Sequence, residues 1–355
     1  MSIENANYIK YKLKVPYYDI IYIENGDNMT TKKKRKKRLR LRYEGVKFLT
    51  YFIFFLLLFI YTITNSIKVY SFYQYKKTDE YKIRTMGYSL EETKDFLKII
   101  NDDIKEFLLT NPKEDIYYSI TQEKYFLPKN YIKYIEYQKS NQSLSLKDII
   151  AMVNVHSSEG WYNNTYKTDM SKKNLILVNK FYQLEEGYER DDLVKIPLQY
   201  AYDDNKAAKE VVDKYIEMHK KVKEKLGVHL MVNSSFRSYE EQNEIYKSFR
   251  SKGEAYADAY AARPGFSEHQ TGLAIDITST AHPYTEDFKE SEEFEWLKNN
   301  CYKYGFILRY PEGKEKITGY STESWHFRYV GVENATKIFK EGITLDEYYA
   351  YFIEK

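Results

Sequence analysis

The chain has 355 residues, with 55 Lys and Arg against 52 Asp and Glu, and it is 43% hydrophobic and 17% aromatic. This composition excludes a wholly disordered or fibrous chain, and the length accommodates about two domains of about 150 residues each. Cys301 is the single cysteine, which excludes an intrachain disulfide and a multi-cysteine metal cluster. Any metal ion must therefore be held by histidines and carboxylates.

Positive charge is concentrated near the N-terminus. Residues 1–47 carry 13 Lys and Arg and 5 Asp and Glu, a net charge of +8, whereas the other 308 residues carry 42 and 47, a net charge of −5. Nine of the 11 residues in 32–42 are basic. Such a run alone also suits nucleic acid, but its place directly before an apolar stretch favours a membrane-topology signal. We therefore expect no nucleic-acid partner.

The apolar stretch covers residues 46–67, and its only charge is Lys47. A helix of that length reaches about 33 Å, enough to cross a bilayer core of about 30 Å. The sequence thus predicts one transmembrane helix that anchors the chain in a lipid bilayer. The positive-inside rule places the basic tail, residues 1–45, in the cytoplasm and the rest outside the cell membrane. A cleaved signal peptide is the alternative, but no small-residue cleavage site follows the stretch.

The segment after the apolar stretch is polar and rich in Tyr, which is typical of a stalk. Ser89 and Glu92 have the spacing of a helix capping box, and apolar residues then recur at helical spacing from Phe96 to Leu108. Later stretches repeat the helical pattern. We predict an extracellular stalk and helical spacer over 68–149, whose composition points to no particular chemistry.

The remainder mixes strand-like and helical patterns. Two short runs, IIAMVNV at 149–155 and LILVNKFY at 175–182, are typical of strands, and residues between them are rich in turn formers. Residues 203–226 form an amphipathic pattern typical of a helix, and 228–236 are predicted to form a strand.

Two of the six histidines have neighbours that point to chemistry. His269 follows a Pro-Gly turn, and Asp276 lies seven residues later on a predicted strand. His326 lies on another predicted strand, where alternation places it opposite Trp325, Phe327 and Tyr329. Two imidazoles and one carboxylate can hold Zn²⁺ and leave its fourth position open, as in catalytic zinc sites. The spacing alone does not separate this set from ordinary structural histidines.

Two carboxylates could take a proton from water at such a site. Glu323 precedes His326 by three residues, and positions i and i+3 of a regular strand face opposite sides. We therefore expect Glu323 in the turn before the strand. Glu268, next to His269, is the alternative base.

Arg237 and Gln242 flank the start of a predicted helix. Ser238 and Glu241 form a capping box there, and a helix N-terminus attracts anionic groups. The planar guanidinium of Arg237 suits a carbonyl or carboxylate of a substrate. The alternative is that both are ordinary surface side chains.

The chain resembles the VanY-type D-alanyl-D-alanine carboxypeptidases, zinc peptidases of the bacterial cell wall. Four segments carry the resemblance, in the family's order, over roughly residues 150–340: SSFRSYEEQ, SEHQTGLAID, WLKNNCYKYGFILRYPEGKEKITGY and ESWHFRYVG. The resemblance implies an α+β fold for a catalytic domain at 150–345, with a small antiparallel sheet and flanking helices around a zinc site.

By the same resemblance, His269, Asp276 and His326 match the zinc ligands and Glu323 matches the catalytic base. The family usually has Pro directly after this base, where this chain has Ser324. Pro would stiffen the turn that aims the base, so its absence bears on rigidity and removes no catalytic group.

Four further positions match groups that face the substrate in the family. Arg237 matches the arginine that steadies the scissile carbonyl and its developing oxyanion. Gln242 and Ser267 match polar positions that contact the C-terminal residue of the substrate, and Trp325 matches the aromatic residue next to the second histidine.

The resemblance implies a membrane-anchored zinc metallopeptidase that removes the C-terminal D-alanine from peptidoglycan stem peptides. Three alternatives stay open: an L,D-carboxypeptidase, a peptidoglycan endopeptidase, and a non-catalytic zinc-binding wall module.

Overall fold

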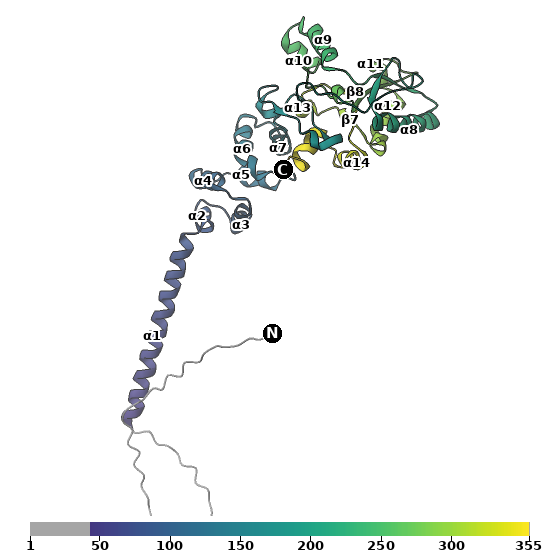
Figure 1. Cartoon of the computed structure of the whole chain (residues 1–355). Helices are drawn as coiled ribbons and strands as arrows, with labels where there is room; N and C mark the ends of the chain where they lie inside the picture. The colour runs from purple at the N-terminus through teal and green to yellow at the C-terminus, as the bar shows by residue number, and fades with distance from the viewer. Residues whose placement is uncertain (1–42, 355) are drawn as a thin grey trace, which may run out of the picture. The chain divides into compact units, whose positions relative to one another are not determined.

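A computed structural model of the chain describes residues 43–354 (Figure 1). The predicted basic tail, residues 1–45, falls almost entirely outside the described residues. The chain divides into two compact units, residues 1–72 and residues 73–355.

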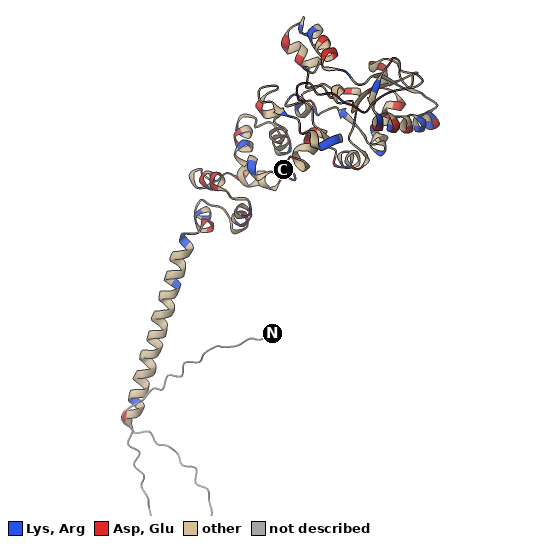
Figure 2. Cartoon of the chain, in the orientation of Figure 1, with Lys and Arg blue, Asp and Glu red and all other residues tan. Residues whose placement is uncertain are grey.

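The described part of the first unit is the helix α1 (Tyr43–Lys76), of 34 residues, whose last four residues belong to the second unit. At about 1.5 Å per residue it extends about 51 Å. None of its residues is buried, and in Figure 2 the ribbon of this helix is tan along its middle and carries the colours of charged residues toward its two ends. By length and composition this helix can cross a membrane. It contains the predicted span, 46–67, and continues beyond it at both ends.

The second unit combines helices with short strands. The α-helices are α2 (Asp79–Thr85), α3 (Leu90–Ile99), α4 (Asp102–Thr110), α5 (Asp115–Ser119), α6 (Tyr131–Ser140), α7 (Leu146–Asn154), α8 (Lys209–Leu226), α9 (Tyr239–Arg250), α10 (Glu254–Tyr260), α11 (Thr285–Phe288), α12 (Glu292–Asn300), α13 (Glu315–Thr318), α14 (Val332–Glu341) and α15 (Leu345–Phe352). The strands are β1 (Tyr166–Lys167), β2 (Tyr182–Gln183), β3 (Leu193–Lys195), β4 (Lys206–Ala208), β5 (Leu230–Ser234), β6 (Ala274–Ser279), β7 (Phe306–Tyr310) and β8 (Glu323–Tyr329). Six 3-10 helices connect them: η1 (Ile120–Gln122), η2 (Pro128–Asn130), η3 (Ser157–Glu159), η4 (Met170–Leu175), η5 (Glu268–Thr271) and η6 (Cys301–Tyr304).

Helices α2 to α7 form a helical layer with its own apolar core. The capping box of Ser89 and Glu92 is present at the start of α3, as predicted. The periodic stretch that follows is not one helix, because Asn101 interrupts it: its side chain accepts a hydrogen bond from the Ile104 N–H and so begins α4. Asn competes with the helix backbone for hydrogen bonds, which makes it a helix start more readily than a helix interior.

Helix α7 joins this helical layer to the rest of the second unit. Ile149, Ile150 and Val153 lie in the apolar core of α2 to α7, while Ala151 and Met152 lie in a second core with α14 and α15. The strand predicted at 149–155 is therefore wrong: the run is apolar on all sides because it is a helix buried between two cores. Tyr125 adds a further contact, since its ring stacks on Tyr351 of α15 with centroids 4.0 Å apart.

The strand predicted at 175–182 is also largely wrong. Only Tyr182 belongs to a strand, β2, and the segment before it turns sharply. The Asn179 side chain accepts hydrogen bonds from the N–H groups of Phe181 and Tyr182, at 2.8 and 2.9 Å. An Asn side chain that accepts from the backbone two residues later forms an Asx turn. This turn outweighs the strand propensity of the neighbouring residues.

The central feature is a four-stranded sheet in the order β5-β6-β8-β7, in which every neighbouring pair is antiparallel. This confirms the predicted small antiparallel sheet and the strand at 228–236, and α8 confirms the helix within 203–226. Alternation divides the sheet into two faces. One face packs against α8 and α12 through residues that include Val232, Ile275, Ile277, Phe306 and Phe327. The other face carries Asp276, His326, Arg309 and Arg328, which do not belong to this apolar core.

The cap at Asn101 provides a test of the break between α3 and α4. We expect Asn101→Ala to lower the free energy of unfolding by about 1 kcal/mol, because the first turn of α4 loses its side-chain acceptor. Asn101→Asp is the matched control and keeps an acceptor in place. Chemical denaturation measures both, and equal stability of Asn101→Ala and the unchanged chain would contradict the capping role.

Candidate functional site

Three metal-ligating side chains converge on the polar face of the sheet. Asp276 of β6 and His326 of β8 are direct partners across the two strands, and His269 comes from η5, just before β6. Each offers one donor atom, and these atoms lie within 4.8 Å of one another. His326 Nδ1 lies 3.0 Å from Asp276 Oδ1, and His269 Nε2 lies 3.4 Å from Asp276 Oδ2.

The outer nitrogen of each imidazole has its own partner. His269 Nδ1 lies 2.7 Å from the Ser235 carbonyl oxygen, and His326 Nε2 lies 3.3 Å from Glu268 Oε2. A carbonyl or an ionised carboxylate only accepts, so each outer nitrogen can keep its proton and leave the opposite nitrogen available to a metal ion held beside Asp276. Second-sphere contacts of this kind are typical of metal-binding histidines. The donor set therefore fits a Zn²⁺ ion with three protein ligands.

A tight turn brings His269 to the sheet. Gly272 ends η5 with a φ of +65°, and a Cβ there would lie 2.8 Å from the Leu193 side chain. Glycine is thus required both for the backbone conformation and for the close approach.

The site opens into a cavity of about 340 Å³. The eight side chains that match site positions of the family and the alternative base, Glu268, all contribute to it; the eight are Arg237, Gln242, Ser267, His269, Asp276, Glu323, Trp325 and His326. Its other lining residues are mainly apolar and come from α9, α10 and the segments beside the sheet: Ile245, Phe249, Tyr260, Phe266, Tyr310 and Tyr320. One side of the cavity is therefore charged and polar, and the other is apolar.

Glu323 is the first residue of β8 and not part of the preceding turn, which corrects the sequence-based expectation. It pairs with Tyr310 beyond a register shift in β7, and such an irregularity re-aims side chains at a strand end. Its Oε2 lies 3.8 Å from His326 Nδ1, and Trp325 also lines the cavity although it neighbours His326 on the strand. Burial raises the pKa of Glu323 to about 7.

Asp276 has the opposite electrostatic setting. Burial disfavours its charged form, but His269 and His326 outweigh burial and hold the pKa of Asp276 well below its usual range. Asp276 thus stays ionised, whereas Glu323 can gain or lose a proton near neutral pH.

Arg237 and Gln242 form a polar wall of the cavity. Arg237 Nη1 donates to Gln242 Oε1 at 2.8 Å, and Arg237 Nη2 lies 3.5 Å from Asp276 Oδ2. Gln242 Nε2 donates to the Ala262 carbonyl at 2.8 Å, and Gln242 is only 1% exposed. Gln242 is therefore not a surface side chain, and its contact with Arg237 holds the guanidinium at the cavity.

Both carboxylate oxygens of Glu268 contact other side chains of the site. Its Oε1 accepts from Arg309 Nε at 2.8 Å and Arg328 Nη1 at 2.9 Å, and its Oε2 faces His326. Burial opposes its ionisation, but the two arginines outweigh burial and hold the pKa of Glu268 well below its usual range. Both oxygens are occupied, so the geometry favours Glu323 over Glu268 as the group that receives a proton.

Three charged residues of this network received no role from the sequence: Arg309, Arg328 and Asp346. The position of Arg328 could have been predicted, because it lies two residues after His326 and so on the same strand face. No sequence feature places Arg309 and Asp346 near Glu268, since they lie 41 and 78 residues from it in the sequence.

Comparisons with known proteins agree with this geometry. The family model described as VanY, D-alanyl-D-alanine carboxypeptidase, matches residues 204–332. YodJ of Bacillus subtilis (strain 168) is 42% identical over 182 residues, which cover 49% of this chain and 66%, just under two thirds, of YodJ. The bifunctional D-Ala-D-Ala dipeptidase and D-Ala-D-Ala carboxypeptidase VanXYC of Enterococcus gallinarum is 34% identical over 185 residues, which cover 51% of this chain and 95% of VanXYC.

A solved structure shares the fold of the same part of the chain. It is that of the LdcB LD-carboxypeptidase, described as revealing the basis of peptidoglycan recognition, with 39% identity and a TM-score of 0.50. The match covers 53% of this chain and 90% of that chain. With the family model and a relative matched over almost its whole length, the chain belongs to the VanY-type D-alanyl-D-alanine carboxypeptidase family.

Proposed function

We propose that this protein is a zinc-dependent carboxypeptidase that removes the C-terminal D-alanine from peptidoglycan stem peptides. One observation carries the proposal: His269, Asp276 and His326 converge at a cavity that also receives Glu323 and Arg237. Membership of the VanY-type family supports the substrate class.

In this proposal His269, Asp276 and His326 hold the metal. A bound Zn²⁺ supplies Lewis-acid chemistry, since it polarises a carbonyl group and lowers the pKa of water. Asp276 supplies the anionic ligand of this set and contacts both histidines.

Glu323 is the proposed general base. It lies beside His326 at the cavity, and its pKa of about 7 is close to neutral pH. A group with such a pKa can both accept and donate a proton. Glu323 first accepts a proton from the attacking water and then delivers that proton to the leaving amine of D-alanine.

Arg237 is the proposed stabiliser of the negative charge that develops on the scissile carbonyl oxygen. The guanidinium is held by Gln242 and Ser234, so it needs little reorganisation when charge appears. Gln242 and Ser267 are proposed to contact the terminal residue, with Trp325 packing beside it. Recognition of a terminal carboxylate by such a polar wall favours release of one residue over cleavage inside the peptide.

An L,D-carboxypeptidase is the second candidate, and a specific finding favours it. The LdcB LD-carboxypeptidase shares the fold at 39% identity. Both activities release a terminal D-alanine and differ in the configuration of the residue before it.

Product masses from two synthetic stem peptides decide between these candidates. We expect the zinc-loaded full-length protein in detergent to remove one alanine from a pentapeptide that ends in D-Ala-D-Ala. The second peptide is a tetrapeptide stem. Loss of alanine from this tetrapeptide alone would make the protein an L,D-carboxypeptidase. Larger fragments would indicate an endopeptidase, and binding of zinc without cleavage of either peptide would indicate a wall-binding module.

Glu323→Gln tests the proton-transfer role. We expect the rate of D-alanine release to fall by about 10²- to 10⁴-fold, the usual contribution of general acid–base catalysis, because an amide cannot accept the water proton. Zinc content is expected to stay unchanged, since Glu323 is not among the three ligands. Glu312→Gln, on a loop outside the cavity, is the matched control. Full activity of Glu323→Gln would show that another group is the base.

We further propose that α1 crosses the cell membrane once, with the N-terminus in the cytoplasm and the catalytic domain outside. The basic run at 32–42 precedes the apolar helix and supports this orientation. Protease added to intact spheroplasts should then digest a C-terminal tag on the full chain while a cytoplasmic marker survives. Protection of the tag until the membrane is permeabilised would overturn the orientation.

A further inference from the structure

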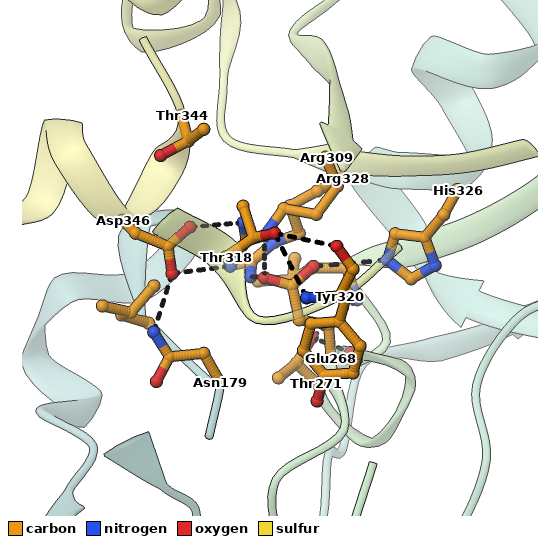
Figure 3. A network of polar contacts seen from close by, with 12 residues as sticks. Asn179, Glu268, Thr271, Arg309, Thr318, Tyr320, His326, Arg328, Thr344 and Asp346 are labelled. Atoms are coloured by element: carbon orange, nitrogen blue, oxygen red, sulfur yellow. Dashed lines mark hydrogen bonds and ion pairs between the residues drawn. The ribbon is translucent and has the colours of Figure 1, made fainter. Parts of the chain in front are cut away.

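A chain of buried ion pairs runs from the C-terminal helix to the candidate metal centre (Figure 3). Asp346 of α15 receives two hydrogen bonds from Arg309, at 2.6 Å from Nη1 and 3.1 Å from Nη2. Arg309 Nε donates to Glu268 Oε1 at 2.8 Å, and Glu268 Oε2 contacts His326 Nε2 at 3.3 Å. Each link is direct, so a side chain on α15 is connected to a metal ligand through two intermediate residues.

The four charged side chains of this network, Arg309, Arg328, Glu268 and Asp346, have no net charge together and are closed to solvent. The side chains of Arg309 and Arg328 are 0% exposed, and those of Glu268 and Asp346 are 1% exposed. Two guanidiniums therefore face two carboxylates with little water to screen them. Buried charges are tolerated only when each has partners, and loss of one partner leaves an uncompensated charge.

Asp346 is the carboxylate of this network that lies farthest from the metal centre, and its loss changes the balance of charge around Glu268. Without the Asp346 carboxylate, Arg309 keeps only Glu268 as its anionic partner, and two buried guanidiniums face one carboxylate. The excess positive charge draws Glu268 away from His326 and disfavours a cation nearby. The aim of the His326 ring and the local potential both change in the direction that weakens metal binding.

We infer that Asp346 is a positioning residue that sets the zinc affinity of the His269, Asp276 and His326 site, acting through Arg309 and Glu268. Asp346 lies on α15, beyond the stretch 204–332 that the family model matches. The inference rests on the proposed function, in which this site holds zinc.

A neighbouring residue separates this role from a general contribution to folding. Glu347 follows Asp346 on α15, its side chain is 2% exposed, and it also has an ionic partner, the partly exposed Lys314, at 2.8 Å. It completes the capping box of α15 with Thr344. Its contacts are in the cap and with Lys314, away from the ion pairs that lead to His326. Glu347→Gln is thus a matched loss of one buried carboxylate from the same helix turn.

The experiment measures zinc affinity of the full-length protein in detergent, by competition with a chromophoric zinc chelator, together with thermal unfolding of the metal-free protein. We expect Asp346→Asn to bind zinc about 10- to 100-fold more weakly, the usual effect of losing an outer-sphere partner. Glu347→Gln is expected to lower the unfolding temperature of the metal-free protein while keeping wild-type zinc affinity. Wild-type zinc affinity in Asp346→Asn, or an equal loss of affinity in both variants, would overturn the inference.

A double-mutant cycle tests the route through Arg309. If Asp346 acts through Arg309, then Asp346→Asn combined with Arg309→Met binds zinc no more weakly than Arg309→Met alone. Additive losses would overturn the route. Asp346→Glu serves if Asp346→Asn does not fold: it keeps the charge but displaces the fork of Arg309, so we expect weaker zinc binding, and unchanged affinity would again overturn the inference.

The same measurements keep this inference distinct from the proposed function. Failure of the unchanged protein to bind zinc would remove the proposed function itself. Zinc binding by the unchanged protein with equal affinity in Asp346→Asn would remove only the role of Asp346.

Discussion

The pairing of charges beneath the sheet constrains the rest of the second unit. Arg309 and Arg328 are fully buried, and a guanidinium without partners in such a place would cost several kcal/mol. Glu268 satisfies both arginines and still reaches His326, so one carboxylate joins the strand β7, the strand β8 and the turn that carries His269. The C-terminal helix must dock because Asp346 completes the pairing of Arg309.

The sheet places the polar side chains of the candidate site next to this charge pairing. Its apolar face packs on α8 and α12, so the residues between the apolar positions are directed to the opposite face. Asp276 and His326 are direct partners across β6 and β8. A shift of one residue in that pairing would turn one of these two side chains to the apolar face, so burial of the hydrophobic residues also fixes the register of Asp276 and His326.

Two carboxylates at the cavity are set apart by their surroundings. Asp276 lies against both histidines and stays ionised, whereas burial raises the pKa of Glu323 to about 7. Different environments of this kind assign different tasks to chemically similar groups. Asp276 and Glu323 are thus distinguished here by their partners and their burial, and not by residue type, which suits the proposed roles of ligand and base.

The family resemblance identified the eight residues that line one cavity, and the sequence by itself determined the local features: the capping boxes at Ser89 and Ser238 and the strand of Asp276. Each depends on neighbours within a few residues, where spacing has direct structural meaning. Tertiary structure alone decided that 149–155 is a helix between two cores, that Glu323 lies in β8 beyond a register shift, and that Glu268 is held by Arg309 and Arg328. Those outcomes depend on burial and on ion pairs between residues as far as 60 positions apart, and no periodicity records such distant partners.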